Sequence, residues 1–194
     1  PETAAEGMRI IAGQWRGRTL ATVGRGDDDA HLRPTTDRTR ESLFNMLAGG
    51  RYGDPITGAR VLDLFAGTGA LALEALSRGG VHATFVDNGR IAQGLIRKNI
   101  TLCGAKDTTL IATDATRLPA NQGAGCNLIF LDPPYGKGLG TPALAAAQLG
   151  GWLAPQALIV CEDATETPAP PGLTRLDSRR YGDTVVTIMQ AEAA

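Results

Sequence analysis

Four aspartates stand on or just after short apolar segments of the chain, and their spacing could bring them to one site. Asp63 lies within the first segment, Asp87 and Asp132 end the second and fourth, and Asp114 follows the third. In an open parallel sheet, ligands bind beyond the carboxyl ends of the strands. A turn or a helix cap explains any single aspartate, but it explains four at one edge poorly. We therefore expect a ligand site at this edge.

A glycine-bearing turn follows the first apolar segment and is typical of a nucleotide-cofactor loop. Residues 62–70 read LDLFAGTGA, in which Gly67 and Gly69 let the backbone approach a ligand closely. Asp87 lies 20 residues after Gly67, where a carboxylate can bind both hydroxyls of a ribose. Several nucleotide cofactors share this pattern. Because a carboxylate repels a pyrophosphate and attracts a sulfonium and an ammonium, Asp63 favours S-adenosylmethionine over NAD.

The predicted cofactor site extends from this turn to the next two strand ends. Asp114 and Ala115 would face the adenine, since a carboxylate can accept a hydrogen bond from its exocyclic amine. The predicted cofactor-binding residues are Asp63, Phe65, Gly67, Thr68, Gly69, Asp87, Asn88, Asp114 and Ala115. The histidines and cysteines show no metal-ligand spacing, so we expect no metal.

The fourth segment ends in Asp132, Pro133, Pro134 and Tyr135, which we expect to be the catalytic tetrad. A turn after a strand is the simpler explanation of two prolines. Beside a cofactor loop, however, the Asp132 carboxylate and the Pro133 carbonyl can each accept one hydrogen of a planar amine. The prolines fix the backbone, and the Tyr135 ring offers a stacking face for a base. Holding both hydrogens turns the amine lone pair toward an electrophile, so methyl transfer needs mostly positioning and electrostatics.

Alternating apolar and helical patterns predict the elements that position these residues. Continuous apolar runs, typical of strands covered on both faces, occupy residues 61–65, 83–86, 110–112, 128–131 and 157–160. Helical patterns occupy residues 70–78, 90–103 and 142–149, the last with Thr141 as N-cap and Pro142 in the first helical position. This repeated order predicts a Rossmann-like α/β fold with a mainly parallel sheet. Residues 173–181 and 184–190 predict a closing antiparallel hairpin.

The amino-terminal part of the chain reads differently. Residues 8–12 and 18–23 predict a β-hairpin, and a helix is expected from about Thr36 to Gly49. Seven arginines precede position 41, which indicates either a solvated face or a nucleic-acid surface. We expect residues 1–7 to be a tag or processing remnant, residues 8–50 an RNA-facing extension and residues 51–194 the methyltransferase domain.

Composition is that of a single soluble domain. The chain has 194 residues, of which 43% are hydrophobic and 20% charged, with a formal net charge of -1. No apolar run is long enough to span a membrane. Cys103, Cys126 and Cys161 are odd in number and lie in apolar surroundings, which favours free thiols in a reducing compartment. We therefore expect a cytoplasmic protein without membrane contact.

Four blocks of the sequence resemble the RsmD family of bacterial 16S ribosomal RNA (guanine-N2)-methyltransferases. The blocks are MRIIAGQWRGR at residues 8–18, LRPTTDRTRESLFN at residues 32–45, residues 62–78 and the tetrad. The resemblance implies a class I S-adenosylmethionine-dependent methyltransferase fold and methylation of one guanine in 16S rRNA. It also implies that the partner is the small ribosomal subunit or its assembly intermediate. We expect a monomer whose RNA contacts include Arg9, Arg16, Arg18, Arg33 and Arg38, although Arg38 could serve the cofactor instead.

Other classes of protein fit parts of the pattern. The tetrad recognises an amine rather than a whole macromolecule, so an amino-methyltransferase acting on DNA or protein is one alternative. A catalytically idle RNA-binding module is another, and intact Asp63, Gly67, Gly69 and Asp132 argue against it. An NAD-linked enzyme comes third, because no evident proton-relay residue accompanies the loop.

Overall fold

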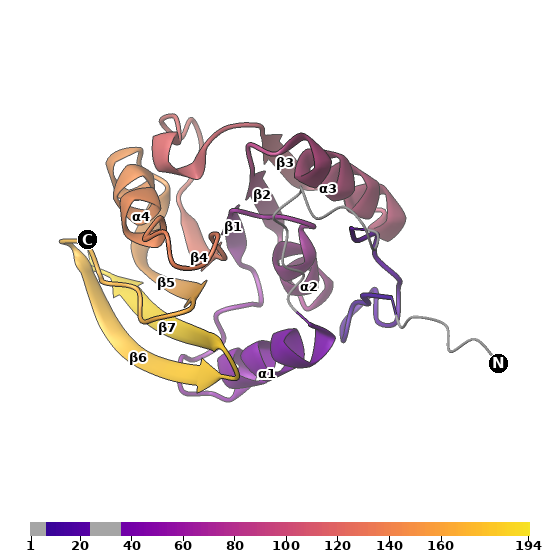
Figure 1. Ribbon diagram of the computed structural model, residues 1–194, viewed down its shortest axis with the longest axis horizontal. Helices are drawn as coiled ribbons and strands as arrows, with labels where there is room; N and C mark the ends of the chain where they lie inside the picture. Colours follow the sequence, from indigo (N-terminus) through magenta and orange to yellow (C-terminus); the bar gives the residue numbers. More distant parts are fainter. Residues whose placement is uncertain (1–6, 24–35) are drawn as a thin grey trace.

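The apolar runs form strands and the helical patterns between them form helices. The computed structural model describes residues 7–23 and 36–194. Its strands are β1 (Arg60–Leu64), β2 (His82–Val86), β3 (Thr108–Ile111), β4 (Cys126–Leu131), β5 (Leu153–Asp163), β6 (Leu173–Tyr181) and β7 (Thr184–Ala191). Its helices are α1 (Asp37–Ala48), α2 (Ala70–Ser77), α3 (Arg90–Cys103), the short 3-10 helix η2 (Ala115–Arg117) and α4 (Gly140–Leu149). Figure 1 shows them in chain order.

All seven strands form one sheet in the order β3-β2-β1-β4-β5-β7-β6. Strands β1 to β5 run parallel to one another, whereas β7 runs antiparallel to β5 and β6 antiparallel to β7. The predicted Rossmann-like sheet and its antiparallel closing hairpin are therefore confirmed. Strand order reverses between β1 and β4, and a ligand site is expected beyond the carboxyl ends of those two strands.

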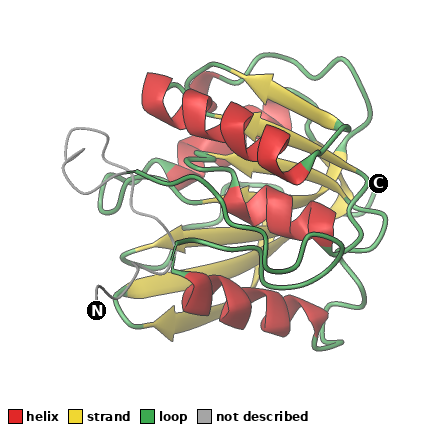
Figure 2. Cartoon of the chain, turned by 90° about the vertical axis from the view of Figure 1, so that its right-hand side faces the viewer, coloured by secondary structure: helices red, strands yellow, loops and turns green. Residues whose placement is uncertain are grey.

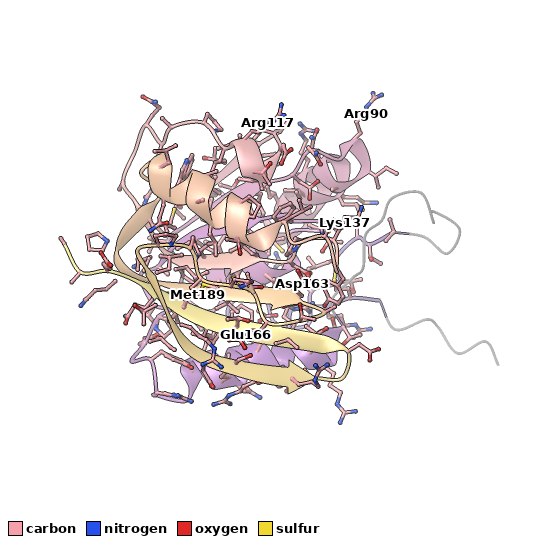
Figure 3. All side chains as sticks on the ribbon, turned by 60° about the vertical axis from the view of Figure 1, so that its left-hand side comes forward. Arg90, Arg117, Lys137, Asp163, Glu166 and Met189 are labelled. Atoms are coloured by element: carbon pink, nitrogen blue, oxygen red, sulfur yellow. The ribbon has the colours of Figure 1, made fainter. Side chains whose placement is uncertain are left out.

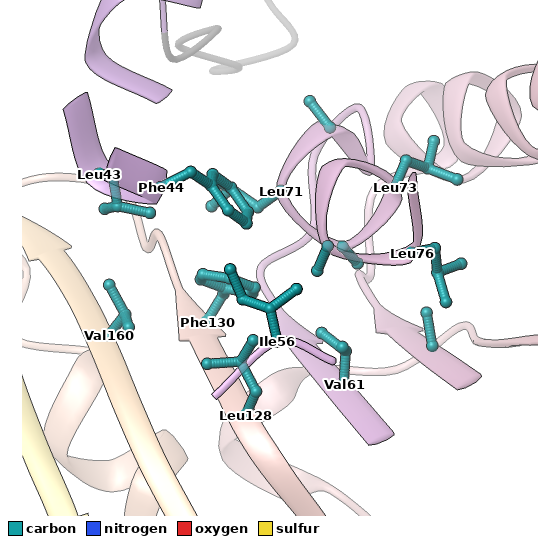
Figure 4. Close-up of a cluster of buried hydrophobic side chains, with 14 of the residues drawn as sticks. Leu43, Phe44, Ile56, Val61, Leu71, Leu73, Leu76, Leu128, Phe130 and Val160 are labelled. Atoms are coloured by element: carbon teal, nitrogen blue, oxygen red, sulfur yellow. The ribbon is translucent and has the colours of Figure 1, made fainter. Parts of the chain in front are cut away.

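Two hydrophobic cores, one on each face of the sheet, explain the continuous apolar strands. Helices α1, α2 and α3 pack against one face and α4 with η2 against the other (Figure 2). Within β1, Val61 belongs to the first core and Leu62 to the second. Figure 4 shows part of the first core, where the rings of Phe44 and Phe130 lie 5.7 Å apart. Burying each such side chain stabilises the fold by about 1.5–3 kcal/mol.

The predicted amino-terminal hairpin is reduced to a single β-bridge between Arg9 and Thr19. The two predicted segments, residues 8–12 and 18–23, do pair antiparallel, but only two backbone hydrogen bonds join them, because the next N–H groups donate to helix α2 instead. Ile11 and Ala12 donate to the two carboxylate oxygens of Glu74, at 2.8 and 3.1 Å. The amino-terminal arm, residues 7–23, is therefore bound to α2 by side-chain and backbone contacts.

Helix α4 begins two residues before the predicted start. Thr141 was expected to be its N-cap, but the structure places Leu139 in that position and Thr141 inside the helix. The Thr141 hydroxyl donates instead to the carbonyl of Pro168, at 2.7 Å. Pro142 remains in the first turn, where its missing N–H costs no helical hydrogen bond.

Candidate active site

The sheet places the glycine turn and the catalytic tetrad side by side. Leu64, at the end of β1, is in register with Leu131, at the end of β4. The N–H of Asp132 donates to the carbonyl of Leu64 at 3.4 Å, so the first tetrad residue is tied to the strand that leads into the turn. This is the pair of strands between which strand order reverses.

The turn after β1 has a left-handed backbone at three positions. Gly67 and Gly69 have φ angles of +60° and +79°, which glycine adopts without strain. Phe65 has a φ of +57°, a conformation that costs a residue other than glycine about 1–3 kcal/mol. A Cβ on Gly69 would also come within 3.0 Å of the Phe85 ring. The surrounding structure therefore holds this turn in a fixed shape beside α2.

Asp87 connects the ends of β1 and β2 through both of its carboxylate oxygens. Its Oδ2 accepts a hydrogen bond from the N–H of Gly67 at 3.0 Å, and its Oδ1 accepts from that of Gly89 at 2.8 Å. Asp87 is half-buried, and a carboxylate has about four acceptor sites. It can therefore fix the glycine turn and still accept hydrogen bonds from a ribose.

Asp63 is almost completely buried beneath the same turn. Its Oδ2 accepts from the N–H of Ala72 at 3.2 Å, while its Oδ1 is buried and finds no hydrogen-bond partner among the described residues. Burial raises the pKa of the Asp63 carboxyl well above its usual range, and repulsion from Asp132 and Asp87 adds to this. Asp63 is thus close enough to both of the other acids to be repelled by them. An unsatisfied carboxylate oxygen here fits a ligand that brings a donor or a positive charge.

The remaining predicted cofactor residues lie at the neighbouring strand ends. Asp114 caps η2: its Oδ1 accepts from both the N–H and the hydroxyl of Thr116, which lowers the pKa of the Asp114 carboxyl. Ala115 is buried and Asn88 is exposed. Thr68 is buried, and its carbonyl accepts from the amide of Asn99.

Two residues that sequence reasoning missed hold the tetrad in place. The Tyr135 hydroxyl is hydrogen-bonded to that of Thr184, in β7, at 2.7 Å. Asp163, the last residue of β5, accepts from the N–H of Gly136 at 3.0 Å. The signal for Asp163 was available, because it is another strand-end acid. Nothing in the sequence marks Thr184.

Asn99 is a third missed residue, and it joins the cofactor turn to the amino-terminal arm. It is fully buried in α3. Its amide donates to the carbonyl of Thr68 at 2.8 Å and to that of Ala21 at 2.9 Å, and its Oδ1 accepts from the N–H of Ala21 at 2.6 Å. The arm therefore packs directly against the back of the turn.

The predicted RNA-contacting arginines have different surroundings. Arg9, Arg16 and Arg38 are exposed. Arg18 is also exposed, but its Nη1 donates to the last carbonyls of α3, those of Leu102 and Cys103, at 3.3 and 2.8 Å. Arg33 lies outside the described residues.

One basic residue of this part of the chain cannot belong to an RNA-binding surface. Arg40 is completely buried, where it pairs with Glu74 and Asp37. The count of seven arginines therefore overstates the charge available to RNA at this end.

Within residues 7–23 and 36–194, no helix could cross a membrane. The same residues form no cluster of three or more side chains suited to a metal ion.

Comparison with solved structures shows the class of fold. The chain superposes on the yhhF protein of Escherichia coli with a TM-score of 0.80 and 38% identity, covering 96% of this chain and 99% of that one. TrmN from Thermus thermophilus shares the fold at 23% identity and a TM-score of 0.62, covering 79% of this chain and 48% of that one. The sheet order, the glycine turn and the strand-end acids define a class I methyltransferase fold.

Comparison of sequences gives the family. The chain belongs to the family described as Conserved hypothetical protein 95, whose model matches residues 8–190. It is 41% identical over 163 residues to ribosomal RNA small subunit methyltransferase D of Escherichia coli K12, covering 84% of this chain and 78% of that protein. The protein of the same name from Haemophilus influenzae is 36% identical over 182 residues, covering 90% and 89%. The predicted RsmD family membership is confirmed.

Proposed function

We propose that this protein transfers a methyl group from S-adenosylmethionine to the exocyclic N2 amine of a guanine in 16S rRNA. The observation that carries this proposal is that the tetrad lies beside the glycine turn, because the N–H of Asp132 donates a hydrogen bond to the carbonyl of Leu64, the last residue of β1. The relatives named ribosomal RNA small subunit methyltransferase D support the RNA substrate.

The residues around the turn suit this cofactor. S-adenosylmethionine supplies an electrophilic methyl group on a positively charged sulfur. The buried Asp63 carboxylate would offset positive charge, and its unsatisfied Oδ1 would accept from an ammonium group. Asp87 would bind the ribose hydroxyls while its bonds to Gly67 and Gly89 keep the backbone in place.

The tetrad would hold the target amine. The Asp132 carboxylate and the Pro133 carbonyl would each accept one hydrogen, which orients the nitrogen lone pair toward the cofactor side. The Tyr135 ring, fixed by Thr184, would stack on the base. Asp132 also places negative charge beside the nitrogen, which becomes positive as it is methylated. The methylated amine then loses its proton to Asp132 or to water.

The substrate would be the small ribosomal subunit or its assembly intermediate. The protein would act on it as a monomer in the cytoplasm. Residues 8–50 would form an RNA-facing extension of the methyltransferase domain, 51–194, and the exposed Arg9, Arg16 and Arg38 support this role. The three cysteines are free and buried, which suits a reducing compartment. The proposed monomer is supported by the exposed large apolar side chains of the described residues. They come from three places in the chain, Val81, Ile91 with Leu102, and Leu149, rather than from one element that could form an interface.

Nucleoside analysis tests the proposed function. Small and large ribosomal subunits from a strain that lacks the gene would be incubated with the protein and labelled cofactor, digested and examined by mass spectrometry. We expect N2-methylguanosine from small subunits alone. Label on a ring nitrogen, on ribose or only in large subunits would contradict the proposal.

A further inference from the structure

Three strand ends at the candidate site carry an exposed cation a few residues beyond their acid. Arg90 follows Asp87 by three residues, Arg117 follows Asp114 by three, and Lys137 follows Asp132 by five. Arg90 is the first residue of α3 and Arg117 the last of η2, so both lie just beyond carboxyl strand ends. We call Arg90, Arg117 and Lys137 the rim cations; Figure 3 labels all three, and the side chains of Arg90 and Arg117 project away from the protein.

The rim cations make no ion pair with another described residue, unlike two of the arginines on the closing hairpin. Arg175 pairs with Glu166, and Arg179 pairs with Asp177. All three rim cations are exposed. Arg117 is near enough to Asp114 to lower the pKa of that carboxyl, but none of the three guanidinium or ammonium groups is held in a close ion pair with a described residue, so each can reach a ligand.

The acids at this edge make such positive charge necessary for an RNA substrate. Asp63, Asp87 and Asp132 stand at the carboxyl ends of neighbouring strands, and both Asp87 and Asp132 repel Asp63. Phosphates approaching them would also be repelled, over distances up to about one Debye length. Cations placed just outside the acids would make the electrostatic potential positive where an approaching phosphate first contacts the protein.

We propose that Arg90, Arg117 and Lys137 bind phosphates of the RNA strand on either side of the target nucleotide. This inference rests on the proposed function and names the surface through which the RNA is held. Lys137 would contact the phosphate nearest the methylated base, because it lies two residues after Tyr135. Gly136 and Gly138, with φ angles of +76° and +64°, flank it, and a Cβ at either position would meet no other atom within 4 Å.

Salt-dependent binding tests the proposal. A triple variant, Arg90→Gln, Arg117→Gln and Lys137→Gln, would be compared with a control of equal charge change, Arg97→Gln, Lys98→Gln and Lys106→Gln. The control residues are also exposed, and Lys106 lies near the amino end of β3, away from the site. Binding to unmethylated small ribosomal subunits would be measured across a range of salt concentrations, and S-adenosylmethionine affinity by calorimetry.

Each phosphate contact contributes roughly 0.7–0.9 to the slope of log affinity against log salt, so the triple variant should lose roughly 2–3 units of slope. The control should keep the parent slope, and both variants should keep the parent cofactor affinity. An unchanged slope in the triple variant, or an equal loss in the control, would overturn the proposal. Loss of cofactor affinity in the triple variant would overturn it too, by assigning the cations to the cofactor. Since binding is measured without turnover, failure of the parent to methylate small subunits would count against the proposed function alone.

Discussion

Tyr135 and Thr184 are joined by a hydrogen bond of 2.7 Å between their hydroxyl oxygens. The bond links the last residue of the tetrad to the first residue of β7, 49 residues later in the chain. The closing hairpin therefore has a direct contact with the group that we expect to stack on the base. Because the bond restrains the tyrosine hydroxyl, it also restrains where the far end of the ring lies.

Removing this bond should weaken substrate binding. Tyr135→Phe and Thr184→Val should each raise KM for small ribosomal subunits by about 2- to 10-fold, equivalent to one neutral hydrogen bond of roughly 0.5–1.5 kcal/mol, with little change in kcat. The double variant should be no worse than either single one, since both remove the same interaction. Steady-state kinetics with all three variants measures this. Fully additive losses would mean that the two hydroxyls act separately.

Asn99 should matter to cofactor binding although it lies behind the turn. Asn99→Ala removes three hydrogen bonds to Thr68 and Ala21 and leaves buried backbone groups without partners, so stability should fall by about 1–3 kcal/mol or more. The folded variant should also bind S-adenosylmethionine several-fold more weakly. Calorimetry below the melting temperature measures this, with Thr101→Ala on the exposed side of α3 as control. If the variant were less stable but bound S-adenosylmethionine as tightly as the parent, Asn99 would stabilise the arm without contributing to cofactor binding.

The buried Glu74 should be among the most important residues for stability. Glu74 and Arg40 are both fully buried and paired, and Glu74 also accepts from Arg78 at 2.9 Å. Glu74→Gln would remove the one fully buried carboxylate that faces Arg40, leaving it only the half-buried Asp37, and should destabilise the fold by roughly 3–5 kcal/mol. Glu166→Gln, which breaks the exposed pair with Arg175, should cost about 1 kcal/mol or less. Urea unfolding measures the free energy of unfolding of both variants. If both lost the same small amount, the buried pair would contribute no more to stability than the exposed one.

The raised pKa of Asp63 predicts a pH-dependent effect of its removal. Between the ordinary value of 3.8 and the higher folded-state pKa, the native protein binds more protons than the unfolded chain, so this group destabilises the fold as pH rises. The stability of Asp63→Asn relative to the parent should therefore increase with pH through that window.

Asp54 provides a control of opposite sign. Hydrogen bonds from Thr57 and Ile56 lower the pKa of its carboxyl, so it contributes stability above 3.8 that is lost as pH falls through its lowered pKa. Asp54→Asn should remove that contribution. Urea unfolding at several pH values measures both variants. A pH-independent difference between Asp63→Asn and the parent would contradict burial of an ionisable carboxyl at this position.

The fold could be predicted because its determinants are local. Strands with both faces covered need continuous apolar runs, and the turn at Gly182 and Asp183 marks the closing hairpin. The strand-end acids followed from strand positions alone. What could not be predicted depends on contacts between distant segments. Two N–H groups of the arm, those of Ile11 and Ala12, donate to Glu74, 62 or 63 residues away, so its own pattern could not show that its strand pairing is so short. Thr184 and Asn99 likewise gain their roles from partners that only the folded chain brings near.

The most direct test of the account is single-turnover methyl transfer by Asp132→Asn. Asparagine keeps the size and one acceptor oxygen but removes the charge beside the reacting nitrogen. The variant should bind S-adenosylmethionine and small ribosomal subunits as the parent does, and it should transfer the methyl group roughly 100- to 1,000-fold more slowly. A transfer rate close to that of the parent would contradict the assignment of Asp132 to the amine.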